Sequence, residues 1–192
     1  MSVQTRSDEA QSIIRADTPY PAMLLIGRLD AIAGAVASFD FQNIPATFSK
    51  LVIDLYARGD KAATSADINI GFNNDGSAIY DSIRQHVRHS ASLTTWETLE
   101  AGYVPIAVMA AASAPASAFD QIRIEIANYA NTNGHKTAIS EYGIKLNTTT
   151  TNIILGSGRA WYRSTNAINR ITLTPLAGNF AQYSTARLYG VV

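Results

Sequence analysis

The feature that most constrains this chain is an alternation of apolar and polar residues with a period of two. The segment 119–129, FDQIRIEIANY, places three isoleucines on one side of an extended chain and Arg123 and Glu125 on the other. The segment 51–58, LVIDLYAR, alternates in the same way. This period is typical of a half-buried antiparallel strand, with one face on a core and one face in solvent.

The alternation recurs along most of the chain, with clusters of turn-forming residues between the segments. An Asn-Asp-Gly cluster ends at Gly76, and Asn133 with Gly134 predicts a hairpin between 119–129 and a return strand over 137–144. Further strands are expected in 23–29, 35–41, 67–72, 151–157, 170–175 and 186–192. About ten strands without a long helical period predict an all-β fold, an antiparallel β-sandwich of jelly-roll-like type.

One segment is ambiguous. In residues 78–89, AIYDSIRQHVRH, the apolar residues Ile79, Ile83 and Val87 recur at a spacing that suits a helix as well as one face of a strand. A short helix and a strand are both compatible with this pattern.

The two ends of the chain differ in character. Residues 1–21 are mostly polar and end in TPYP, whose prolines favour extended backbone. We expect an extended N-terminal arm over 1–21, followed by one β-sandwich domain over 22–192. The last residues alternate again, which predicts that they form a strand within the sheet.

Composition excludes several classes of function. The 192 residues carry 15 basic and 15 acidic side chains, so no charge excess suggests a nucleic-acid partner. There is no cysteine, which excludes disulfides and thiolate chemistry. The start lacks the pattern of a signal peptide and no apolar run reaches 18 residues, so we expect synthesis in a cytoplasm and no membrane insertion. With 47% hydrophobic and only 16% charged residues, part of the surface is expected to be covered by neighbours.

Short motifs give no catalytic, cofactor or metal residue. His86 and His89 lie three residues apart with His135 distant, and the arginines beside the pair would repel a cation. The tripeptide Arg58-Gly59-Asp60 matches an adhesion motif, but a strand that ends at Arg58 and a loop that begins with Gly-Asp explain it better. The GSGRAW segment at 156–161 lacks the Lys-Ser/Thr of a phosphate-binding loop.

Aromatic residues are the remaining indication of function. They could pack in the core, line a subunit interface or stack on a sugar. The sequence alone does not separate these roles. The residues concerned are Tyr80, Trp96, Tyr103, Tyr129, Tyr142, Trp161, Tyr162, Tyr183 and Tyr189.

Four segments carry a resemblance to a known family. They are FQNIPATFSKLVIDLYARGD, DINIGFNNDGSAIY, RIEIANYANTNGHKT and ITLTPLAGNFAQYSTARLYGV. In this order they resemble a β-rich module of tailed-bacteriophage virion proteins, over about residues 35–192. The resemblance implies a non-enzymatic virion component with a jelly-roll-like sandwich that is commonly trimeric.

Two functions follow as expectations. The first is a capsid decoration, or cement, protein that trimerises, binds the major capsid protein or another virion protein, and stabilises the shell through its arm. Apolar residues in a polar arm need a partner surface, which makes Ile13, Ile14, Tyr20 and Pro21 the expected contacts.

The second is a tail-tip or short-fibre module that binds a host surface glycan, with Trp96 and Trp161 as stacking residues. A glycan-degrading enzyme on the same fold is a third hypothesis, which would require two acids about 5 to 9.5 Å apart in a groove.

Overall fold

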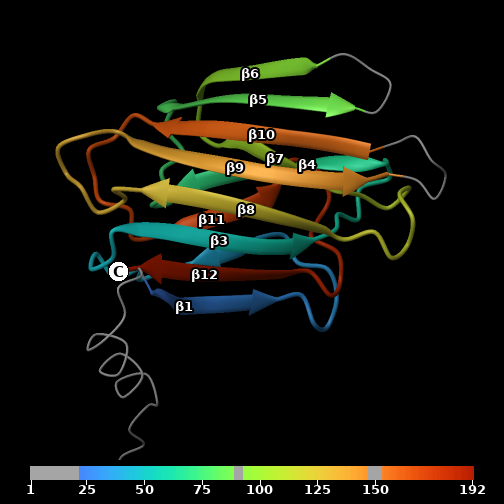
Figure 1. Cartoon of the computed structure of the whole chain (residues 1–192), viewed down its shortest axis with the longest axis horizontal. Coiled ribbons are helices and arrows are strands. Elements are labelled where there is room, and N and C mark those ends of the chain that lie inside the picture. Colours follow the sequence, from blue (N-terminus) through green and yellow to red (C-terminus); the bar gives the residue numbers. More distant parts are fainter. Residues whose placement is uncertain (1–21, 89–92, 147–152) are drawn as a thin grey trace, which may run out of the picture.

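A computed structural model describes residues 22–88, 93–146 and 153–192. The described chain forms two antiparallel sheets packed face to face (Figure 1), so the all-β sandwich prediction is confirmed. The large sheet contains, in spatial order, β1 (Met23–Asp30), β12 (Thr185–Val191), β3 (Lys50–Ala57), β8 (Asp120–Ala127), β9 (Lys136–Lys145), β10 (Ile153–Tyr162), β5 (Tyr80–Arg88) and β6 (Thr94–Ala101). The small sheet contains β2 (Phe39–Phe41), β11 (Ile171–Pro175), β4 (Ser65–Phe72) and β7 (Val104–Ala110).

The core lies between the sheets and follows the predicted alternation. On β3, Leu51, Ile53 and Leu55 are fully buried, and on β8 the isoleucines opposite them are fully buried as well. Arg123 and Glu125 lie on the outer face of the large sheet, the face turned away from the small sheet. The buried residues of both sheets form one continuous hydrophobic cluster.

The last strand is part of the large sheet. Strand β12 pairs with β1 on one side and with β3 on the other, as Figure 1 shows near the C-terminal label. Its inward residues Ala186 and Leu188 are fully buried. The prediction of a structural final strand is therefore confirmed.

Of the ambiguous segment 78–89, residues 80–88 form a strand, β5, preceded by a bend. Strand β5 pairs with β10 and β6. Its apolar residues Ile83 and Val87 lie on the exposed outer face, whereas Arg84 and His86 are buried on the inner face. Ile83 and Val87 are four residues apart, so the spacing that suits a helix also keeps both on one side of a strand.

Three details of the predicted strands are corrected. The turn between β8 and β9 is an eight-residue loop whose left-handed residue is Asn128, with φ of 52°, so Asn133 and Gly134 do not form a tight two-residue turn. The strand expected over 35–41 is reduced to β2, and Val36 makes only an isolated bridge to Phe180. Strands β6 and β7 were not predicted.

Four of the eight tyrosines that the structure describes belong to the core. Tyr80, Tyr129 and Tyr162 are fully buried, and Tyr142 is almost so. The Tyr80 hydroxyl bonds both the amide and the carbonyl of Phe72, at 2.9 Å each, and so ties β5 of the large sheet to β4 of the small one. Among the described residues, no helix is long and apolar enough to cross a membrane.

Candidate functional site

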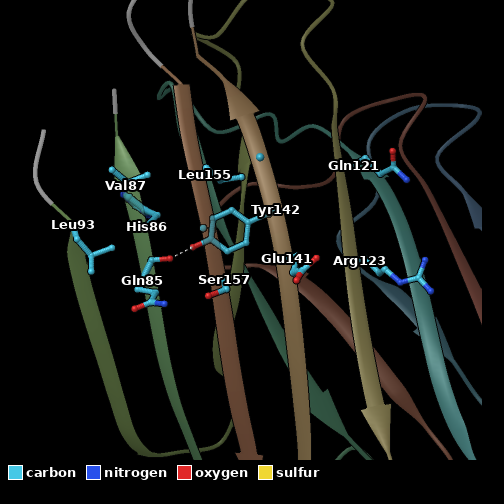
Figure 2. A pocket seen from close by; sticks show the side chains of 12 residues that line it. Gln85, His86, Val87, Leu93, Gln121, Arg123, Glu141, Tyr142, Leu155 and Ser157 are labelled. Atoms are coloured by element: carbon cyan, nitrogen blue, oxygen red, sulfur yellow. Dashed lines mark hydrogen bonds between the residues drawn. The ribbon is translucent and has the colours of Figure 1, made fainter. Parts of the chain in front are cut away.

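A shallow groove crosses the outer face of the large sheet and is the best-formed candidate site. It has a volume of about 640 Å³. Figure 2 shows its lining side chains, which come from β8, β9, β10 and β5 and from the residue that precedes β6. The lining residues are Gln85, His86, Val87, Leu93, Gln121, Arg123, Glu141, Tyr142, Gly143, Leu155, Gly156 and Ser157.

Strand register places these residues in two rows across the sheet. One row is polar and consists of Arg123, Glu141, Ser157 and Gln85, each opposite the next on a neighbouring strand. The other row is apolar, with Leu155 opposite Val87 on one side and Gly143 on the other. Because Gly143 has no side chain, the surface is hollowed beside Leu155.

The floor of the groove is supported by Tyr142 from the inner side of the sheet. Its ring lies across Gly156, where an added Cβ would come within 2.6 Å of the Tyr142 ring. The Tyr142 hydroxyl reaches the carbonyl of Gln85 at 3.5 Å, the dashed line in Figure 2. Gly156 is thus needed for a close approach between β9 and β5, and the ring fills the space that its missing side chain leaves.

The charges near the groove compensate one another. Arg123 lies 3.1 Å from Glu125 and 3.7 Å from Asp54, and Glu125 also pairs with Lys50 at 2.7 Å. The hydrogen bond from Lys50 and then that from Arg123 lower the pKa of Glu125 despite its partial burial. The groove therefore offers amide, hydroxyl and compensated charged groups beside an apolar row, which suits a polar and largely uncharged ligand or a peptide.

The side chains that line the groove are not arranged as a hydrolytic site. Ser157 lies on the outer face and His86 on the inner face of adjacent strands, so the imidazole does not approach that hydroxyl. Glu141 is the one carboxylate among the described residues that line the groove. A two-carboxylate glycosidase site of the kind considered above would need a second acid there.

The two tryptophans lie on opposite faces of the large sheet. Trp96 is on the inner face of β6, where its ring contacts His86, with centroids 4.3 Å apart, and the guanidinium of Arg84 at 5.8 Å. Trp161 is on the outer face of β10, opposite Asp81 and Thr137. They cannot form one stacking platform, and neither lines the groove. A sugar-binding role for either one stays a prediction.

Other sequence candidates fall in different places. Ile13, Ile14, Tyr20 and Pro21 of the arm lie outside the described residues. His89 does too, while His86 and His135 lie toward opposite ends of the large sheet. In the described parts of the chain no cluster of three or more metal-ligating side chains is found.

The adhesion-like tripeptide is engaged within the fold. The Arg58 side chain is buried and donates to the carbonyls of Pro115, Ala118, Ala112 and Ala114, so it organises the loop after β7. Asp60 accepts hydrogen bonds from the amide and the side chain of Asn179. Arg58 is therefore not available to a receptor.

Two joined loops carry exposed apolar residues, of which the sequence analysis named Tyr183 among the aromatics and missed Ile32. Ile32 is 71% and Tyr183 is 70% exposed, and their loops are joined by a bond from the Tyr183 amide to the Ala31 carbonyl. Tyr183 has φ of 73°, a left-handed conformation that is unusual for a bulky residue. The sequence carried one signal, a tyrosine within a turn-rich segment.

No protein-family model and no curated protein matches this chain.

Proposed function

We propose that this protein is a non-enzymatic structural component of a bacteriophage virion, a capsid decoration protein that forms trimers and docks on the shell of the major capsid protein. The four segments that resemble virion modules support this proposal. So does the balanced charge, because docking on a protein shell does not require the basic surface that nucleic acid would.

The observation that carries the proposal is an apolar surface at the β5–β6 end of the large sheet. Large aliphatic side chains there are between 38% and 63% exposed. They are Ile83, Val87, Leu93, Ile153 and Leu155. Covering such a side chain completely contributes about 1.5 to 3 kcal/mol, so a neighbouring protein on this surface would be bound mainly by burial.

The arm supplies the second part of the proposal. It precedes β1 at the opposite end of the large sheet from β6, as Figure 1 shows from the positions of these two strands. An extended segment of 21 residues can span roughly 70 Å, which is enough to reach another subunit or the shell. Its apolar residues Ile13, Ile14 and Tyr20 would anchor it there.

Deletion of residues 1–21 tests the proposal. We expect the truncated protein to keep the β-type circular dichroism spectrum and the thermal unfolding midpoint of the full chain, because the core lies within 22–192. We expect it to lose co-sedimentation with phage particles that lack their decoration protein. The matched control is the full chain with Ile13→Ser and Ile14→Ser, which keeps the arm but removes two anchors and should bind weakly.

Two outcomes would contradict these statements. Normal decoration by the truncated protein would show that the arm is not the contact. Failure of the intact chain to bind any capsid or tail particle would overturn the virion proposal as a whole.

A second candidate function is favoured by the groove. Its polar row of Gln85, Ser157, Glu141 and Arg123 beside an apolar row resembles the mixed lining by which proteins hold sugars or peptides. Binding of a host surface glycan there would make the protein a tail-tip or short-fibre module. A glycan array with the intact chain, and with Gln85→Ala as the comparison, tests this candidate.

A further inference from the structure

The large sheet ends on two edge strands that complement each other. Its spatial order begins with β1 and finishes with β6, and among the described residues neither strand has a second strand beside it. An open edge presents backbone donors and acceptors that can pair with another chain. All residues of both strands are exposed or half-buried.

The direction of the strands allows the sheet to continue from one copy into the next. The eight strands alternate in direction, because each neighbouring pair in the sheet is antiparallel. The two edges therefore run in opposite directions. When β6 of one copy lies beside β1 of another, the pairing is antiparallel and the outer faces stay on one side.

A single register matches the side chains of the two edges. With Arg28 of β1 opposite Glu97 of β6, Leu29 falls opposite Trp96 on the inner side. The bulge between Leu25 and Gly27 then brings Leu25 next to Leu99 on the outer side. Leu25 and Leu99 are 56% and 60% exposed, Trp96 is 40% exposed, and the side chain of Arg28 is 52% exposed beside Asp30.

Charge disfavours one symmetric alternative. Pairing β6 with β6 would bring Glu97 and Glu100 of both copies to one seam, and like charges across a strand pair destabilise it. Pairing β1 with β1 is neutral in charge, because Arg28 and Asp30 both lie on that strand, but it leaves the β6 edge unpaired. The mixed pair is the one that sets an acid of β6 opposite a cation and brings Leu25 next to Leu99.

We propose that copies of this chain associate head to tail, with the β6 edge of one copy paired to the β1 edge of the next. Such a contact joins two different edges, so an open row of copies always has one free edge at each end. A closed ring leaves no edge free. A ring of three copies would be the form of the trimer. The inference thus rests on the self-association included in the proposed function, and it names the contact.

Charge reversal at the two edges tests the contact. Arg28→Glu and Glu97→Lys each place like charges at the seam, and we expect each to raise the dissociation constant roughly tenfold per contact, measured by light scattering across a dilution series. Mixing the two variants should restore association in part. A contact between unlike copies again joins opposite charges, whereas a ring of three always keeps one contact between like copies. The double variant R28E/E97K should associate on its own.

The controls are charge reversals away from the edges. Arg159→Glu and Lys145→Glu lie on exposed positions of the central strands β10 and β9, outside the groove lining, and should leave the dissociation constant unchanged. Circular dichroism of each variant checks the fold, and rescue by mixing excludes misfolding as the cause.

Three results would overturn the inference: a monomeric intact chain at all concentrations, an effect of Glu97→Lys without one of Arg28→Glu, or no rescue on mixing. A monomeric intact chain would also contradict the trimer of the proposed function, whereas the other two results bear on this contact alone and leave binding to phage particles to test that function.

Discussion

At the scale of single residues, the sandwich holds an acid whose ionisation opposes folding. Asp120 begins β8 and is 4% exposed. Burial raises the pKa of its carboxyl from 3.8 to about 6, although the hydrogen bond from the Ala110 amide and the nearby charge of Arg58 act in the opposite direction. The folded protein therefore keeps a proton on Asp120 at a pH where the unfolded chain has lost it.

The substitution Asp120→Asn isolates this effect. Between pH 4 and 6 the folded wild type binds more protons than the unfolded chain, so its stability relative to the variant falls as the pH rises. Across this window the difference should change by about 2 kcal/mol in favour of the variant, out of about 3 kcal/mol over the whole titration, and should level off near pH 7, since one pKa unit corresponds to about 1.4 kcal/mol. Urea unfolding of both proteins from pH 4 to 7 measures it.

The asparagine oxygen can still accept the Ala110 amide, which makes the variant a conservative one. A difference in stability that does not vary over this pH range would contradict the argument. The acids with lowered pKa values, such as Asp40 beside Arg170, cancel in the comparison because both proteins contain them.

At the scale of elements, an ion pair between β5 and β4 links the two sheets. Arg84 of β5 bonds both carboxylate oxygens of Asp67 on β4, at 2.8 and 3.1 Å, and approaches the Ala107 carbonyl of β7 at 3.4 Å. The guanidinium side chain is 7% exposed, whereas that of Asp67 is 31% exposed. Loss of the Asp67 side chain therefore leaves a buried cation, whereas loss of the Arg84 side chain leaves a partly exposed carboxylate.

We expect Asp67→Ala to destabilise the protein by about 2 kcal/mol or more, because it leaves a buried guanidinium without its counter-ion. Arg84→Met should cost less, since methionine fills the apolar part of the site and water hydrates the half-exposed carboxylate that remains. Chemical unfolding of both variants and of the double variant gives the comparison. Equal losses in the two single variants would show that the pair acts only through its own attraction.

The strands that the sequence predicts are those with one buried and one solvated face. In β3 and β8 the buried isoleucines and leucines alternate with Asp54, Arg123 and Glu125, so the alternation in the sequence corresponds to the pattern of burial. Strand β5 breaks this rule, because Arg84 and His86 find partners between the sheets while Ile83 and Val87 face outward. The periodicity of the local sequence carries no information about those partners, because they lie on other strands.

The two strands that were missed lack alternation for opposite reasons. Strand β6 is an edge with both faces open, and its sequence TTWETLEA has no apolar side. Strand β7 is covered on both faces, so VPIAVMA is apolar almost throughout. The groove could not be predicted because Gly143, Leu155 and Val87 come from strands whose order in the sheet, β9-β10-β5, departs from their order along the chain.

At the scale of the whole molecule, the proposed association would have to rely on local contacts. The 15 basic and 15 acidic residues cancel, so no net charge steers one copy toward another. The large sheet instead ends in a β1 edge with Arg28 and a β6 edge with Glu97, on opposite sides of the molecule (Figure 1). A contact between the β6 edge and the β1 edge gives each copy one partner on each side of the sheet, whereas a two-fold contact would use the same edge of both copies.

The two tryptophans report which part of the molecule a second copy covers. Trp96 lies on the β6 edge, whereas Trp161 lies on the outer face of β10 and points away from the small sheet. Head-to-tail pairing would cover Trp96 with Leu29 of the next copy and leave Trp161 unchanged. In the variant Trp161→Phe, where Trp96 is the remaining tryptophan, emission should therefore shift to longer wavelength on dilution.

The variant Trp96→Phe is the matched comparison, and its emission should not change on dilution over the range in which light scattering shows dissociation. Phenylalanine keeps an apolar ring at the edge, so association is expected to weaken without being lost. A shift confined to Trp161 would place the contact on the outer face instead, where the exposed Leu155 and Ile83 lie. In that case the apolar surface would join copies to one another, and the shell would have to bind elsewhere.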